Sequence, residues 1–399
     1  TRDGPTAKPV TADDYLFQRD FRRSEHIIDP YGANYYTTEI VDVSKYDDYT
    51  ISVTSGAASP GEELLYSTSI APSPRHFHKL DENWVEDYNW RVEPITGPYQ
   101  ISNVEKGRFV ELSRIDDWWG NDKKYFEYRF NPDRIRLNII REESVAFEYF
   151  LRGELDRYLL TGLSARWHDQ AVGEDFDNGY IGKIEYYVDV PQRARGLWIN
   201  QSDPILSDRN IRYGLAHALD FERVLSRVFR GDYARLQQSL EGYYWGYSNP
   251  DIRAREFDLE LADSYFDAAG WTGRASDGIR TKDGQRLSVR VSYATDEHTP
   301  WLVVLREEAK KAGIELTLQL LDPSAWSNQI NERGFQLSFV NYGTYLVPNP
   351  WGSWHSDNAN NPNTSNITNT ANPVLDDLIE RYDDGTTLEE RVRLAHEIQ

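Results

Sequence analysis

One stretch in the C-terminal half constrains the fold more than any other. Residues 287–294, LSVRVSYA, have the composition of a short buried strand, and residues 314–321, IELTLQLL, have that of a second one. Between them, residues 299–313 (TPWLVVLREEAKKAG) have the apolar spacing of an amphipathic helix that ends at a glycine. A strand, a helix and a strand in this order predict a β-α-β unit with two parallel strands in one sheet.

Helices and strands also alternate through the rest of the chain. We expect a helix over 11–25 that is entered through TADD, with Thr11 as its cap and Asp14 three residues later. Further helices are expected over 144–156 and 258–271, which stop at Gly153 and Gly270, and in VLDDLIERYDD after an Asn-rich loop (355–373). Two strands are expected within 36–56, joined at Lys45–Asp48, and a hairpin over 96–115 that turns at Glu105–Gly107. This order predicts an α/β fold whose mixed sheets carry helices on their faces.

The segment NIRYGLAHALDFERVLSRVFRG (210–231) gathers polar residues around His217 and Asp220 and has two interpretations. In a continuous helix, both side chains lie opposite the apolar stripe and face solvent. In the second interpretation, a helix ends near Leu219, Asp220 caps another helix, and Gly231 is its stop. Both give the cluster a structural role. Zinc sites on a helix usually need two histidines on one face, so we expect neither catalysis nor metal binding here.

Composition bounds the class of protein. A chain of 399 residues is too long for one ordinary core and predicts two or three domains. Its net charge of −21 argues against a nucleic-acid-binding role, since phosphates would be repelled. Cysteine is absent, which excludes thiol nucleophiles, disulfides and cysteine-ligated zinc. No apolar run approaches the length of a membrane span. Methionine is absent even at position 1, so we expect either that the chain is part of a longer protein or that methionines are omitted from the sequence.

Other motifs that could carry chemistry give weak signals. His76 and His78 in the sequence HFH would lie on one face of a strand near Glu82, which is a possible metal site. The carboxylate pairs Asp116–Asp117 and Asp376–Asp377 could suggest a glycoside hydrolase, but such pairs are expected by chance among 65 acidic residues. No G-x-S-x-G elbow and no P-loop is present in the sequence. We therefore expect no catalytic residues, no metal and no cofactor.

Several segments resemble, in order, those of one protein family. They are DGPTAKPVTADD, SPRHF, TGPYQI with GRFVELSRIDDWWG, DRIRLNII with AFEYFLRGELD, GLWINQSDPILSDRNIRYGLAHALDFERV and ELADSYFDAAGW. Together these segments cover most of residues 3–380 and are similar to the family 5 extracellular solute-binding proteins, the oligopeptide- and dipeptide-binding components of ABC importers. ALDFER and FNPDRIR are more similar to the branch that handles microcin C-like peptides.

The resemblance implies a two-lobed, periplasmic binding protein-like fold of type II (cluster C) with an extra small domain. By this comparison, residues 1–95 form part of the small domain, 96–200 part of the first lobe, and 201–399 the second lobe. The N-terminal strands and the C-terminal return that complete the first lobe are expected to lie outside this chain. In this family the segment around residues 210–231 is scaffold, which agrees with both interpretations of its pattern.

The resemblance also implies a function without catalysis. Such proteins close two lobes around a ligand and present it to a membrane permease of an ABC transporter. It implies a peptide or peptide-like ligand, a monomer, no enzyme activity, and a location in the periplasm or on a lipid anchor outside the cytoplasmic membrane. The alternatives are an oligosaccharide bound by the same fold and, from a different class, a carbohydrate hydrolase.

The resemblance places the ligand-binding residues after the strand in FQLSFVNYGTYLVP (335–348). In the family an acidic residue there usually holds the ammonium group of the peptide, but this stretch contains no Asp or Glu. Thr344 or Tyr345 occupies that place, and Tyr342 stands where an aromatic residue is common. The expected ligand-binding residues are Asn341, Tyr342, Gly343, Thr344, Tyr345 and Trp354, in a neighbourhood that also holds Asn349 and Trp351. The alternative is that these aromatic residues pack the lobe.

Overall fold

The computed structural model describes residues 8–27, 29–56, 60–160, 164–186, 191, 194–342 and 346–399. The chain divides into two compact units. Unit 1 comprises Thr1–Ile28, Ser44–Ile51 and Ala71–Leu160, and unit 2 comprises Asp29–Val43, Ser52–Ile70 and Thr161–Gln399. The division predicted from the family, with boundaries at residues 95 and 200, stays a prediction.

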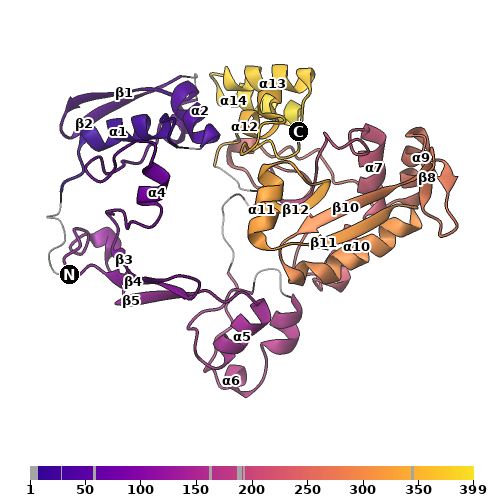
Figure 1. Ribbon diagram of the computed structural model, residues 1–399, viewed down its shortest axis with the longest axis horizontal. Helices are drawn as coiled ribbons and strands as arrows, with labels where there is room; N and C mark the ends of the chain where they lie inside the picture. Colours follow the sequence, from indigo (N-terminus) through magenta and orange to yellow (C-terminus); the bar gives the residue numbers. More distant parts are fainter. Residues whose placement is uncertain are drawn as a thin grey trace. The chain divides into compact units, whose positions relative to one another are not determined.

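The β-α-β prediction is confirmed in unit 2 (Figure 1). Strand β10 (Ser288–Tyr293) pairs in parallel with β11 (Glu315–Leu320), and α10 (Thr299–Lys311) connects them. β12 (Leu337–Tyr342) is parallel to β10, while β6 (Ala194–Ile199) is antiparallel to β12. The strand order is β11-β10-β12-β6, so the sheet is mixed, as the sequence predicted.

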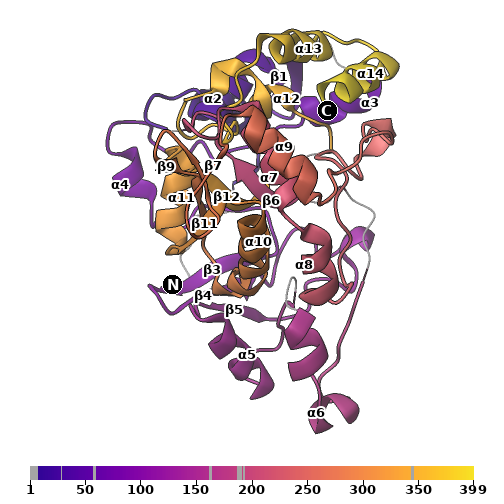
Figure 2. The same ribbon diagram turned by 90° about the vertical axis from the view of Figure 1, so that its right-hand side faces the viewer.

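The two faces of this sheet are covered by different elements. One face packs in the main core against α7 (Arg209–Ala218), α9 (Leu259–Ala268) and α10, with fully buried side chains that include Leu215, Phe266, Val291 and Leu305. Figure 2 shows α7 and α9 side by side. On the other face, α11 (Pro323–Asn331) contributes Trp326, whose indole N–H donates to Ser338 Oγ at 2.9 Å. β10 and β11 still alternate polar and apolar residues, because Val289, Val291, Leu316 and Leu318 pack in or against the main core and the residues between them lie on the other face.

The segment around His217 follows the second interpretation. Helix α7 ends at Ala218, and Asp220 caps α8 (Phe221–Arg227) by accepting the backbone N–H of Arg223 at 2.9 Å. Gly231 has a positive φ of 84°, but α8 already ends at Arg227. The expected solvent position of His217 is wrong. The residue is only 8 % exposed, because its Nδ1–H donates to Glu256 O at 2.8 Å and its ring stacks on Tyr265.

The C-terminal helices have a second, smaller core in unit 2. Helices α13 (Pro373–Asp383) and α14 (Leu388–Ile398) bury Tyr247, Tyr382 and Leu394 against each other. Glu63 of α3 (Gly61–Ser67) is 1 % exposed, pairs with Arg391 and accepts the hydroxyl of Tyr247. This buried ion pair attaches the early segment 52–70 to the C-terminal helices.

The remaining elements of unit 2 are short. They are α2 (Pro30–Thr38), the π-helical turn η2 (Arg166–Gln170), α6 (Glu174–Asp177), η3 (Tyr244–Gly246), β7 (Gly273–Arg274), β8 (Arg280–Lys282), β9 (Gln285–Arg286), η4 (Asp296–His298), α12 (Pro350–Trp354) and η5 (Ser356–Asn358). Strands β7–β9 form a small antiparallel sheet. The helices expected over 258–271 and after the Asn-rich loop are confirmed as α9 and α13, and Gly270 has the positive φ of a helix stop.

Unit 1 is built around the predicted hairpin. β3 (Tyr99–Glu105) and β4 (Phe109–Arg114) pair antiparallel across the expected turn, and β5 (Arg134–Asn138) adds a third strand. The expected helices are confirmed as α1 (Ala12–Arg22) and α5 (Glu143–Leu151), which accompany α4 (Trp84–Tyr88) and the short turn η1 (Lys124–Phe126). Asp14 closes the start of α1 by accepting the backbone N–H of Thr11 at 2.8 Å.

Three local expectations for the N-terminal region are wrong. The strands β1 (Ile40–Asp47) and β2 (Thr50–Ser55) form the predicted pair, but residues 36–38 belong to helix α2, where Asp29 supplies an N-cap before Pro30. The connection expected at Lys45–Asp48 is also displaced, because β1 continues to Asp47. His76 lies in a turn and is exposed, whereas the His78 side chain is 4 % exposed within a cluster of aromatic rings. The two histidines therefore do not form the metal site that one strand face would have given.

Within the described part of the chain, no helix combines the length and the apolar composition that crossing a membrane would require.

Candidate ligand-binding site

The carboxyl ends of the three parallel strands in unit 2 define one edge of the sheet. β10, β11 and β12 end there at Tyr293, Leu320 and Tyr342, and the antiparallel β6 begins there at Ala194. In open α/β sheets, ligands bind at this edge, because the loops that leave the strands there are free to carry polar groups. We call it the carboxyl edge.

Asn341 and Arg195 form a pair at the carboxyl edge. Asn341 lies directly opposite Arg195 in the β12–β6 register, so both side chains are on the same face of the sheet. This face also carries Leu337 and Phe339, which pack in or against the main core. Both Asn341 and Arg195 are exposed, and the structure gives neither side chain a hydrogen bond or ion pair among the described residues. Their donors and acceptors are free for a ligand.

His298 lies beside this pair. It follows β10 in turn η4, and its ring meets Phe339 edge-on with centroids 4.5 Å apart. Burial, together with the nearby positive charge of Arg195, lowers the pKa of His298 from 6.5 to about 4, although Asp296 opposes the shift. The imidazole is therefore neutral near pH 7. Its Nδ1 is buried without a hydrogen-bond partner in the described structure.

The structure places only part of the predicted site. Asn341 is at the carboxyl edge and Tyr342 ends β12, while Gly343, Thr344 and Tyr345 lie outside the described residues. Trp354 is the last residue of α12 and is half-buried. Their role in ligand binding stays a prediction.

Sequence reasoning missed Arg195 and His298. The sequence held one usable signal, the polar run TDEH that follows the strand LSVRVSYA directly. Nothing in the sequence marks Arg195, because its partner Asn341 is 146 positions away and only the antiparallel β6–β12 register brings the two together.

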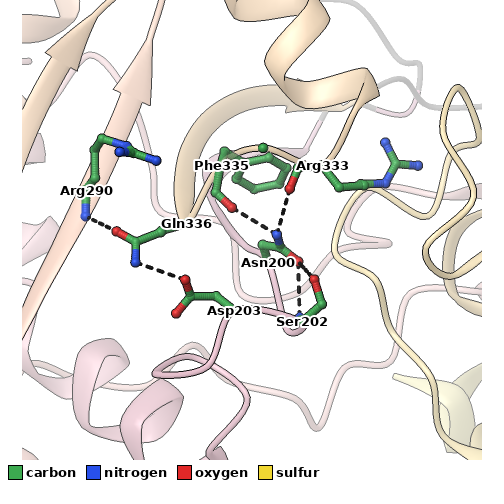
Figure 3. Close-up of a pocket in the computed structure, with 8 residues that line it drawn as sticks. Asn200, Ser202, Asp203, Arg290, Arg333, Phe335 and Gln336 are labelled. Carbon is green, nitrogen blue, oxygen red and sulfur yellow. Dashed lines mark hydrogen bonds between the residues drawn. The ribbon is translucent and has the colours of Figure 1, made fainter.

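The opposite, amino edge of the same sheet carries a hollow of about 380 Å³ (Figure 3). Its lining is polar and comes from segments 200–203 and 333–336 and from Arg290 of β10. Asn200 is 4 % exposed and donates to Arg333 O at 3.1 Å and to Phe335 O at 2.9 Å. Its own side-chain oxygen accepts from Ser202 and from Asn369, both within 2.9 Å. These amide groups are saturated and fasten the loops that enter and leave the sheet.

Arg290 is the exception in this hollow. Figure 3 shows Gln336 between Arg290 and Asp203. Gln336 Oε1 accepts the backbone N–H of Arg290 at 2.8 Å, and Gln336 Nε2 donates to Asp203 Oδ2 at 2.9 Å. The guanidinium itself has no described partner, and its Nε is buried. The hollow lies at the edge where β10 and β12 begin, so it is separate from the carboxyl edge.

The family model of the bacterial extracellular solute-binding proteins, family 5, matches residues 3–364. The chain belongs to this family. Over 88 % of its residues, this family 5 chain is 25 % identical to the oligopeptide-binding protein AppA of Bacillus subtilis. Over 70 % of its residues it is 23 % identical to the uncharacterized protein YejA of Escherichia coli. It spans 62 % of the length of AppA and 51 % of the length of YejA.

Solved structures of similar proteins confirm the fold class predicted for this family 5 chain. AppA of B. subtilis, solved in complex with a nonapeptide, aligns with 98 % of this chain and 75 % of its own, with a TM-score of 0.81 and 22 % identity. A periplasmic oligopeptide-binding protein of Thermotoga maritima, solved with bound mannohexaose, aligns with 98 % of this chain and 73 % of its own, with a TM-score of 0.78 and 20 % identity. The chain therefore has the α/β fold of the two-lobed solute-binding proteins.

The residues that the structure describes contain no group of three or more histidine and acidic side chains that could hold a metal ion. His78 has Glu93 at 3.4 Å, and His168 has Asp232 at 2.9 Å, as isolated pairs.

Proposed function

We propose that the full-length protein is an extracytoplasmic receptor that binds a peptide or peptide-like ligand between two lobes and delivers it to an ABC permease. The observation that carries this proposal is the family 5 match over residues 3–364. The carboxyl edge of the unit 2 sheet supplies free polar groups where such a ligand would dock. In this proposal the protein performs no chemistry, acts as a monomer, and resides in the periplasm or on a lipid anchor outside the cytoplasmic membrane.

The proposed ligand-binding residues are Asn341, Tyr342, Gly343, Thr344, Tyr345 and Trp354, with Arg195 and His298 added from the structure. Asn341 offers an amide donor and acceptor suited to a peptide backbone. Tyrosine and tryptophan rings offer stacking surface, and polar anchors among apolar walls are typical of ligand sites. An extended peptide can also add backbone hydrogen bonds, which makes affinity partly independent of its side chains.

The experiment that tests this function is native mass spectrometry of the purified full-length protein. We expect a co-purified molecule to be released unmodified on denaturation, with the mass and fragmentation of a peptide. Product formation from an added peptide or oligosaccharide would contradict a receptor and favour a hydrolase.

A double variant tests the proposed binding residues. Replacing Tyr342 and Tyr345 together with Ala should weaken ligand binding at least tenfold, about 1.4 kcal/mol, and leave the thermal midpoint of the unliganded protein unchanged. The matched control replaces Tyr180 and Tyr186, which are 81 % and 64 % exposed, and should leave affinity unchanged. A large fall in the midpoint of the first variant would instead mean that these rings pack the lobe.

An oligosaccharide is the second candidate ligand, because the similar T. maritima protein was solved with mannohexaose. Aromatic faces stack on sugar rings, and neutral amides bind hydroxyl groups. Titration with a linear mannohexaose and with short neutral peptides, in parallel, distinguishes the two ligand classes.

A further inference from the structure

We propose that the carboxyl edge binds an anionic group of the ligand, a carboxylate, through the guanidinium of Arg195. This inference rests on the proposed receptor function and specifies the ligand class. It differs from the expectation that an acidic residue near this strand holds the ammonium group of a peptide.

The position of Arg195 is the first support. Its register partner Asn341 lies in the strand expected to contact the ligand, and both side chains extend from the same face of the sheet. Arg195 is exposed and has no ion pair among the described residues. Other arginines of unit 2 are engaged: Arg223, Arg280 and Arg286 have carboxylate oxygens at 3.1, 2.6 and 2.7 Å. The guanidinium of Arg195 thus retains its planar set of donors, which suits a carboxylate in bidentate geometry.

The neighbouring charges are the second support. Arg166 and Glu297 neutralise each other, with 3.9 Å between them and side chains only 11 % and 16 % exposed. Asp296 is exposed, and the structure gives it no ion pair with Arg195. His298 is neutral near pH 7, so it adds no charge, and its buried Nδ1 is unpartnered. Among these five neighbouring groups, Arg195 is the cation without a described partner.

The composition of β12 and its following loop is the third support. Residues 335–348 contain no Asp or Glu, so this stretch offers no carboxylate to a ligand ammonium group. An ammonium group placed beside Arg195 would meet a like charge, which is unfavourable. A carboxylate in the same place meets an opposite charge and the amide N–H₂ of Asn341.

The experiment uses short peptides without acidic or basic side chains, each prepared in four forms: free, N-acetylated, C-terminally amidated, and capped at both ends. Their affinities for the full-length protein are measured by isothermal titration calorimetry. We expect acetylation to change affinity less than threefold and amidation to weaken it at least tenfold. The Arg195→Ala variant should bind the free and the amidated form equally, and Arg195→Lys should recover part of the difference.

Two controls separate a local effect from unfolding. Arg290→Ala removes an unpaired guanidinium at the amino edge and should keep the full preference for the free carboxylate. Circular dichroism should show that Arg195→Ala and Arg195→Lys melt like the wild type, since Arg195 is exposed.

The outcomes distinguish this inference from the function on which it rests. If peptides bind but amidation has no effect, or if Arg195→Ala keeps the wild-type preference, the carboxylate assignment is overturned and the receptor function stands. If no form of the peptides binds, both the peptide-receptor function and the carboxylate assignment are overturned.

Discussion

The two edges of the unit 2 sheet both carry polar side chains, but they use them differently. At the amino edge, the amides of Asn200 and Gln336 are hydrogen-bonded to backbone and side-chain partners within the protein. At the carboxyl edge, Asn341 and Arg195 are exposed and have no described partner, and His298 keeps one buried nitrogen unpaired. Saturated polar groups stabilise the fold, because removing one leaves its buried partners unsatisfied. Unsaturated groups contribute little stability and remain available to a ligand.

The largest expected effect is the loss of Asn200. Asn200→Ala removes a buried amide and leaves the carbonyls of Arg333 and Phe335 without this donor. We expect a loss of about 3 kcal/mol in the free energy of unfolding. Urea denaturation followed by tryptophan fluorescence measures it. Ligand affinity of the folded protein should not change, and a loss below about 1 kcal/mol would show that the network is dispensable.

The second prediction concerns the pH dependence that His298 causes. Because its pKa falls from 6.5 in the unfolded chain to about 4 in the folded protein, the unfolded chain binds more protons between these values. The contribution of His298 to the free energy of unfolding is therefore fully present above about pH 6.5 and is lost as the pH falls toward 4. We expect wild type to lose about 2 kcal/mol more than His298→Phe over this window, after allowance for partial exposure.

The comparison with His298→Phe cancels the contribution of other groups to that pH profile. Burial raises the pKa of Asp383 to about 7, so ionisation of this carboxyl destabilises the folded state as the pH rises. Its effect is opposite in sign and is present in both proteins. Parallel stability profiles for wild type and His298→Phe between pH 4 and 6.5 would show that His298 is not buried in solution.

His217 of α7 is a buried polar residue whose hydrogen bond is made within the protein, as are those of Asn200. Because its ring is buried, stacked on Tyr265 and bonded to Glu256 O, His217→Ala should cost about 1–2 kcal/mol of stability. The exposed His76 is the control, and His76→Ala should be silent in the same denaturation experiment. Neither change should alter ligand affinity. A binding loss in His217→Ala with intact stability would revive a catalytic or ligand role for this segment.

Asn341, at the carboxyl edge, should affect ligand affinity and not stability, which is the reverse of the prediction for Asn200. Asn341→Ala should leave the thermal midpoint unchanged, because the amide is exposed and has no described partner. We expect ligand affinity to fall about fivefold, or about 1 kcal/mol, which is typical of one lost hydrogen bond. Calorimetric titration with the co-purified ligand measures the change. Unchanged affinity together with a lower midpoint would make Asn341 a structural residue like Asn200.

The smallest effect is expected for Arg290. Arg290→Ala should change stability by less than about 0.5 kcal/mol, because its guanidinium has no described partner. It should also leave ligand affinity unchanged, because the hollow lies at the amino edge. A tenfold loss of affinity would move the ligand site to this hollow and remove the functional distinction between the two edges.

The sequence by itself determined the β-α-β unit of the sheet and the family. Apolar residues at strand and helix spacing over 287–321 dictate local structure, and packing of β10, α10 and β11 requires only that their apolar faces meet. The capped helix starts at Thr11 and Asp220 also depend on neighbours within a few residues, so a local pattern is enough to reveal them.

Only the tertiary structure decided which polar residues are used and which are free. The pattern of α7 placed His217 in solvent, but α9 and the backbone of Glu256 cover it from another part of the chain. Arg195 and Asn341 become neighbours through the register of two strands that are far apart in sequence. A hydrogen-bond partner is a property of three-dimensional packing, so no local pattern distinguishes a saturated amide such as Asn200 from a free one such as Asn341.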